Sequence, residues 1–85
     1  MAVTSGEIQA AVKAYIMDEF LPGEDPDDLT TDTPLITGGI LDSIATVKLV
    51  DFLEGRFGVR FQAHEMSADY LDTLDDVAEI VESKM

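Results

Sequence analysis

The residues best placed to do chemistry are Asp42 and Ser43, which close the stretch 38–44 (GGILDSI) together with Ile44. Its two glycines permit an unusual backbone path, and its two central apolar residues can anchor that path. Asp42 can accept a hydrogen bond from a free amide in the first turn of a helix, which places Ser43 at the first helical position with its hydroxyl toward solvent. The amides and the positive dipole end at a helix start stabilise an attached anion, so the pattern suits a phosphate ester on Ser43.

A serine hydrolase is one alternative for Ser43, and the flanking residues argue against it. A nucleophile elbow needs glycine two residues before and after the serine, where this chain has Leu41 and Ala45. His64 is the only histidine, and we interpret it as a solvent-exposed residue of a connection rather than a catalytic base. A serine hydroxyl without a base is a weak nucleophile, so another enzyme would have to modify Ser43. An ordinary, unmodified first-turn serine stays open at this point.

Metal binding is the second alternative, raised by the acidic segment 21–33. An EF-hand starting at Asp25 would need glycine at its sixth position and glutamate at its twelfth, but these are Thr30 and Ile36. The absence of cysteine excludes disulfides, thiolate zinc sites and a cysteine nucleophile, and a single histidine argues against a histidine metal site. We therefore expect no metal site.

Two long amphipathic helices are expected to position Ser43. The first begins after Thr4, which forms a capping box with Glu7, and ends before Pro22-Gly23. The second begins at Asp42 and ends at Phe57, with Gly58 as its C-terminal cap. Their predicted core stripes are Ile8, Ala11, Val12, Tyr15 and Ile16 in the first helix, and Thr46, Leu49, Val50, Leu53 and Phe57 in the second.

The connection between these helices is long and acidic. Residues 21–33 hold five acids, two prolines and no base, a composition typical of a solvated loop. Because long loops in small domains are uncommon unless functional or pinned, we expect Leu29, Leu35 and Ile36 to pin this one to the core.

The rest of the chain predicts one short helix and one last helix. Ser67 can cap a single turn through Leu71, and Thr73 can cap a helix with the stripe Leu74, Val77, Ala78 and Val81. Residues 59–61 alternate like a strand but have no partner strand, so we interpret them as a connection. The sequence thus predicts an all-α fold, a small four-helix bundle of three main helices and one short helix, in a single domain over residues 1–85.

The charge of the chain limits its partners. Five basic residues against 18 acidic ones give a net charge of −13 over 85 residues. Such a surface repels phosphate backbones and anionic membranes and favours basic patches on other proteins, so we expect no nucleic-acid and no membrane partner. The first seven residues do not resemble a signal peptide, and no apolar run could span a bilayer. We expect a cytoplasmic monomer.

With these features the sequence resembles those of the acyl carrier protein family, which includes peptidyl and aminoacyl carriers. Residues 42–44 match its Asp-Ser-Leu/Ile attachment motif, residues 46–57 its second helix, and residues 71–74 (LDTL) its lead into the last helix, so the resemblance covers nearly the whole chain. It implies that a phosphopantetheinyl transferase attaches 4′-phosphopantetheine from coenzyme A to Ser43. The thiol of this arm would carry an acyl or aminoacyl group as a thioester, and the protein itself would be no enzyme. Asp42 would cap the helix and help to position the magnesium ion used in the transfer.

The resemblance also implies where partner enzymes dock. Ile44 and Val47 match positions at which such carriers bind the transferase and the ligases, synthases or transferases that load and unload them. Lys48 and Asp51 share their side of the second helix. Because Ile44 and Val47 lie outside the core stripe, we expect both to be at least partly exposed.

One departure from the family concerns charge. Typical fatty-acid carriers have a strongly acidic second helix, whereas here Lys48 and Arg56 offset Asp51 and Glu54. The acids gather instead in the first loop and in residues 62–85, where seven acids face one lysine. This favours a specialised stand-alone carrier, loaded by a discrete ligase or serving a polyketide or peptide pathway, over a carrier of fatty acid biosynthesis. An unmodified acidic adaptor that only binds proteins remains the alternative, since fold alone does not decide function.

Overall fold

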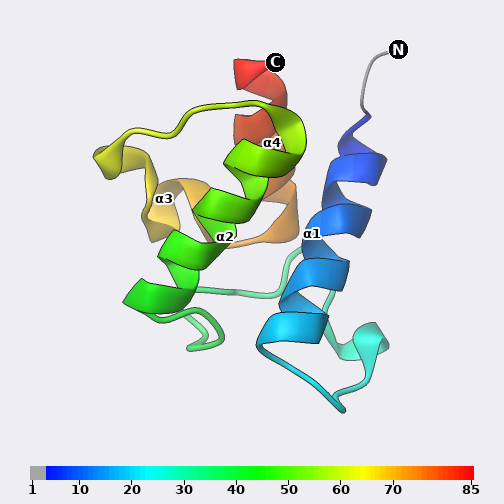
Figure 1. Cartoon of the computed structure of the whole chain (residues 1–85). Helices are drawn as coiled ribbons and strands as arrows, with labels where there is room; N and C mark the ends of the chain where they lie inside the picture. The colour runs from blue at the N-terminus through cyan, green and yellow to red at the C-terminus, as the bar shows by residue number, and fades with distance from the viewer. Residues whose placement is uncertain (1–3) are drawn as a thin grey trace.

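The fold consists of helices joined by irregular connections. The computed structural model describes residues 4–85, and no strand occurs among them. Figure 1 shows the helices, whose bounds are Ser5–Glu19 for α1, Ser43–Phe57 for α2, Ala68–Leu71 for α3 and Leu74–Lys84 for α4. The predicted all-α fold of three main helices and one short helix, with a long connection after the first, is confirmed.

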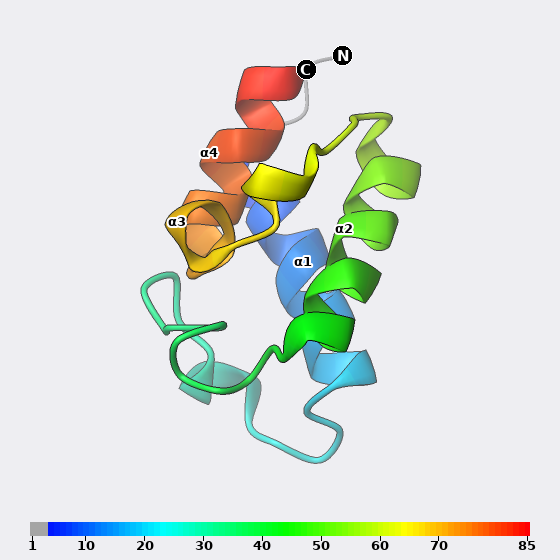
Figure 2. The same ribbon diagram turned by 90° about the vertical axis from the view of Figure 1, so that its left-hand side faces the viewer.

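The helix α1 is the centre of the packing. It runs opposite to α2 and α4 and packs against both of them (Figures 1 and 2). Its predicted start is confirmed, since the Thr4 hydroxyl accepts a hydrogen bond from the amide of Glu7 at 3.2 Å. Its core stripe is confirmed at Ile8, Val12 and Ile16, whose side chains are fully buried, whereas Ala11 and Tyr15 of the predicted stripe are only partly buried.

An aromatic contact joins α1 to α2. The ring of Tyr15 stacks on that of Phe52, with centroids 4.3 Å apart, and meets Phe20 edge-on. Its hydroxyl donates a hydrogen bond to the carbonyl of Lys48 at 3.2 Å. Burial raises the pKa of the Tyr15 hydroxyl, and the carboxylates of Glu19 and Asp51 raise it further. The carboxyl-terminal part of α1 is thereby fixed against the middle of α2.

The long connection closes one end of the bundle, the lower end in Figure 2. It contains a single 3-10 turn, Pro26–Asp28, and its acidic residues lie at the surface. Leu29 and Leu35 are buried and Ile36 is partly buried against the core, so the predicted pinning is confirmed. Leu41 is buried as well and anchors the connection just before α2.

The helices α3 and α4 lie where the sequence predicts them, but their caps and buried residues differ in part from the prediction. Thr73 caps α4 by accepting a hydrogen bond from the amide of Asp76 at 3.0 Å, as predicted. Ile80 joins the predicted stripe in the core, because α4 packs against both α1 and α3 and so buries a wider arc. The predicted cap on α3 is wrong for the side chain of Ser67: α3 does follow Ser67, but its hydroxyl donates to the carbonyl of His64. None of the helices within residues 4–85 has the length and apolar character needed to cross a bilayer.

Candidate functional site

The site begins with the turn that leads into α2. Gly39 has a φ of 85°, a conformation that favours glycine. At Gly38 the backbone passes so close to the carbonyl of Pro34 that a Cβ atom would collide with it. Two backbone hydrogen bonds close the turn, from Leu41 to Leu35 at 2.8 Å and from Gly39 to Ile36 at 3.1 Å. The two glycines singled out in the sequence are therefore required by the path of the chain.

The start of α2 is fixed by Asp42. Its Oδ1 accepts a hydrogen bond from the amide of Ala45 at 2.7 Å, and its carbonyl accepts one from the hydroxyl of Thr46 at 2.8 Å. Ser43 is the first residue of α2 and is exposed, as predicted. At the other end, Gly58 adopts a left-handed conformation and caps α2.

An open groove of about 450 Å³ lies beside Ser43. One side is formed by the start of α2, and the other side comes from the turn before α2 and from the connection before α3. The residues that line it are Ile36, Leu41, Asp42, Ser43, Thr46, Val47, Met66 and Ser67. Met66 and Ser67 could not be recognised as groove residues from the sequence, because they lie more than 20 residues after Ser43. Ile36 lies close to Ser43 in the sequence, but its pattern indicates only that it packs on the core.

The four residues expected to bind partners are all exposed on α2. Ile44 and Val47 are 70% and 49% exposed, which confirms that they lie outside the core. They do not share one hollow, however. Val47 lines the groove beside Ser43, whereas Ile44 and Lys48 line a second hollow of about 290 Å³ together with Phe20 and Ile40. Asp51 is exposed further along α2 and lines neither of the two.

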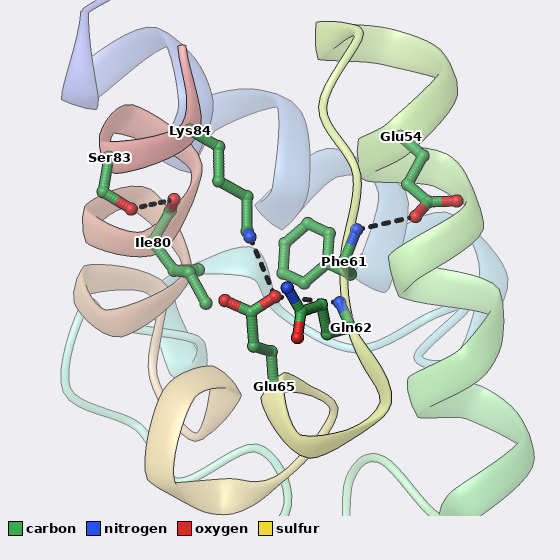
Figure 3. Close-up of polar contacts among 7 residues, drawn as sticks. All are labelled: Glu54, Phe61, Gln62, Glu65, Ile80, Ser83 and Lys84. Atoms are coloured by element: carbon green, nitrogen blue, oxygen red, sulfur yellow. Dashed lines mark hydrogen bonds and ion pairs between the residues drawn. The ribbon is translucent and has the colours of Figure 1, made fainter.

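The connection before α3, which supplies Met66 and Ser67 to the groove, makes polar contacts with two helices, and Figure 3 shows these contacts. Glu54 of α2 accepts a hydrogen bond from the amide of Phe61 at 2.8 Å. Glu65 accepts hydrogen bonds from the amide of Gln62 and from Lys84 of α4, each at 2.8 Å, and these donors lower the pKa of its carboxyl. The ammonium of Lys84 also lies 5.2 Å from the centre of the Phe61 ring. The connection that supplies Met66 and Ser67 is therefore tied to both α2 and α4.

A further acid, Asp72, ties down the turn before α2. Its carboxylate accepts hydrogen bonds from the amides of Ile36 and Thr37 and from the Thr37 hydroxyl, each at 2.9 Å. The bond from the Thr37 amide is the largest cause of a lowered pKa at Asp72, and the other donors from this segment add to it. In the sequence, Asp72 is one of seven acids in residues 62–85. Its only distinguishing feature there is that it belongs to residues 71–74, which resemble the family's lead into the last helix. Its partners lie about 35 residues away, so no local signal could reveal this role.

The electrostatics of α2 suit an attached anion. The first turn of α1 contains Glu7 and that of α4 contains Asp75 and Asp76, whereas the first turn of α2 contains no acid after its cap. The only acid at the start of α2 is therefore the cap itself, Asp42, whose carboxylate accepts a hydrogen bond from the amide of Ala45, while α4 has two acids in its first turn. Within residues 4–85, no group of three or more His, Asp or Glu side chains is arranged to hold a metal ion.

Comparison with known proteins shows which family the chain belongs to. A D-alanyl carrier protein from Streptococcus sanguinis is 36% identical over 73 residues, which cover 86% of this chain and 89% of that protein. D-alanyl carrier proteins from Streptococcus gordonii and Streptococcus thermophilus are each 34% identical over the same shares of both chains. No family model matches the chain. At this identity, over most of its length, the chain belongs to the family of D-alanyl carrier proteins, which are carriers of the acyl carrier type.

Proposed function

We propose that this carrier holds an aminoacyl group on a 4′-phosphopantetheine arm attached to Ser43 and shuttles it between cytoplasmic enzymes. The observation that supports this most strongly is that Ser43 is exposed and is the first residue of α2, beside an open groove. The arm would supply a thiol, which holds a carboxylic acid as a thioester. D-alanine is the cargo we propose first, because the relatives are named for it.

The surroundings of Ser43 fit such an arm. The groove mixes apolar walls, from Ile36, Val47 and Met66, with the polar groups of Thr46 and Ser67. A chain of methylene and amide groups needs both kinds of contact. The proposed phosphodiester would lie at the positive end of the α2 dipole, where an anion is stabilised.

The chain would act as a substrate of the transferase rather than as a catalyst. The oxygen of Ser43 would attack a phosphorus of coenzyme A, forming the new P–O bond as the bond to the nucleotide part breaks. The hydroxyl proton would pass to a base of the transferase, while Asp42 caps α2 through its Oδ1. We propose that the same carboxylate helps to position the magnesium ion that the transferase uses.

The face of α2 around Ile44 and Val47 is our proposed docking surface for the transferase and for the ligases and acyltransferases that load and unload the arm. Both side chains are exposed and follow Ser43 within the first turns of the helix. The helix is close to neutral, since Lys48 and Arg56 offset Asp51 and Glu54. Apolar contact should therefore contribute more to docking here than attraction of a basic partner to an acidic helix.

The test is the intact mass of the protein after incubation with coenzyme A, magnesium and a promiscuous phosphopantetheinyl transferase. We expect the parent and Ser67→Ala to gain one phosphopantetheinyl group each, and Ser43→Ala to gain none while keeping its helical circular dichroism. Ser67 is a matched control because it lines the same groove. An unmodified parent beside a known carrier that is modified in parallel would favour the adaptor that only binds proteins.

The cargo is tested on the loaded protein with ATP and a D-alanine-activating ligase. We expect a mass increase of one alanyl residue that hydroxylamine removes, as it does from thioesters. L-alanine and a long-chain fatty acid with its own ligase serve as comparisons. Preferential loading by the fatty acid would contradict the proposed cargo and leave the carrier role intact.

A further inference from the structure

Asp72 connects the segment between α3 and α4 to residues 35–37, which lie in the turn before α2. It follows α3 and directly precedes Thr73, the cap of α4, so the backbone around it is part of the packed core region. Besides the three hydrogen bonds to its carboxylate, its carbonyl accepts one from the amide of Leu35. A single residue thus receives four hydrogen bonds from residues 35–37.

These bonds act on the segment that delivers Ser43. Residues 35–41 form the turn closed by the hydrogen bond from Leu41 to Leu35, and Asp42 follows it directly. The side chains of Leu35 and Leu41 are buried and fix the two ends of the turn. Between them, Ile36 is partly buried against the core and Thr37 is exposed, so packing constrains this part less than the two ends. Asp72 supplies the missing constraint through charge-assisted hydrogen bonds, which are stronger than neutral ones.

The same turn forms a wall of the proposed arm site. Ile36, whose amide Asp72 binds, lines the groove beside Ser43. Loss of the carboxylate would free Ile36 and Thr37 to move relative to α2. The cap of α2 would persist, because the bond from Ala45 to Asp42 does not involve Asp72.

We propose that Asp72 is a positioning residue for the loading of Ser43: its carboxylate holds the turn 35–41 in the form that the phosphopantetheinyl transferase recognises. This inference rests on the proposed function. Because Asp72 orients the recognised surface and leaves Ser43 on its helix, its loss should weaken recognition of the carrier more than the chemical step.

The test is the steady-state kinetics of phosphopantetheinyl transfer to the full chain. We expect Asp72→Ala to raise the KM for the carrier about tenfold, equivalent to about 1.4 kcal/mol, with little change in kcat. Asp72→Asn should restore most of the loss, because its side-chain oxygen can accept the same two amide hydrogen bonds. Asp69→Ala is the matched control: it removes an exposed acid of α3 whose carboxylate forms no hydrogen bond within residues 4–85.

A second readout does not depend on the transferase. Amide hydrogen exchange at Ile36 and Thr37 should be faster in Asp72→Ala than in the parent, and close to the parental rate in Asp72→Asn. If Asp72→Ala does not fold, Thr37→Val removes one of the bonds to the carboxylate and should give a smaller change in the same direction. If the parent is loaded and Asp72→Ala has the same KM as the parent, the role of Asp72 is overturned while the proposed function stands. An Asp72→Asn variant whose KM is raised as much as that of Asp72→Ala would also overturn the role of Asp72. A parent that is never loaded would instead overturn the proposed function.

Discussion

Glycine at position 38 is a requirement of the backbone rather than of the chemistry. The Cβ of any other residue would meet the carbonyl of Pro34, and a backbone atom cannot move aside without shifting the turn. Gly55 provides the contrast, because it lies inside α2 and a Cβ there would meet nothing within 4 Å. The substitutions Gly38→Ala and Gly55→Ala should therefore have opposite effects on the stability of the fold.

We expect Gly38→Ala to lower the free energy of unfolding by about 1–3 kcal/mol, since something in the turn must shift. Gly55→Ala should raise it by about 0.5–1 kcal/mol, because alanine loses less backbone entropy than glycine in a helix. Urea unfolding followed by circular dichroism measures both. Equal effects of the two substitutions would show that the close approach at Gly38 does not constrain the turn.

At the scale of the elements, α2 carries two tasks on different faces. Leu49, Val50 and Leu53 face the core, while Ile44 and Val47 are left exposed. Exposed apolar side chains that sit singly need no explanation, but these two lie beside the proposed attachment residue. The helix can thus be changed on its outer face with little cost to folding.

The substitution Ile44→Asp should raise the KM of a partner enzyme by about tenfold or more, as expected for an apolar anchor of an interface. Its effect on the free energy of unfolding should stay within about 0.5 kcal/mol, because the side chain is 70% exposed. Ala14→Asp introduces the same charge at an exposed position of α1 and should leave the KM unchanged. A large drop in the melting temperature of Ile44→Asp, with unchanged KM, would contradict the docking role.

The sequence predicted the elements well where the signals were local. Thr4, Asp42 and Thr73 cap helices through residues three positions later, so their pattern is visible along the chain. The contacts of Glu54 and Lys84 across the connection before α3 could not be predicted in this way. They depend on how the helices pack, which places Lys84 against Glu65 and the ring of Phe61. The groove beside Ser43 could not be predicted either, because it too depends on how the helices pack.

For the molecule as a whole, the high negative charge is distributed unevenly. The acids concentrate in the long first connection and in residues 62–85, and α2 stays close to neutral. Among these acids, Asp72 and Glu65 have carboxyl pKa values below their usual ones, because hydrogen-bond donors favour their charged forms. These two acids stabilise the fold despite the net charge.

The pH dependence of stability should reveal the contribution of Asp72. Its pKa in the folded protein lies below the usual 3.8, so its ionised form favours folding. This stabilisation is complete above the pKa of the unfolded chain and is lost as the pH falls through the folded pKa. The difference in free energy of unfolding between the parent and Asp72→Asn should therefore shrink as the pH falls from about 6 to about 2. Denaturant melts at several pH values measure it, and a constant or widening difference would contradict the role of the charge.

The central claim, that Ser43 carries the arm, is tested most directly by mass spectrometry of tryptic fragments after loading. Cleavage after Lys13 and Lys48 releases residues 14–48, in which Ser43 is the only serine. We predict that this fragment alone gains one phosphopantetheinyl group, and that fragmentation within it locates the group on Ser43. A group found on another fragment, or on a threonine of this one, would contradict the account.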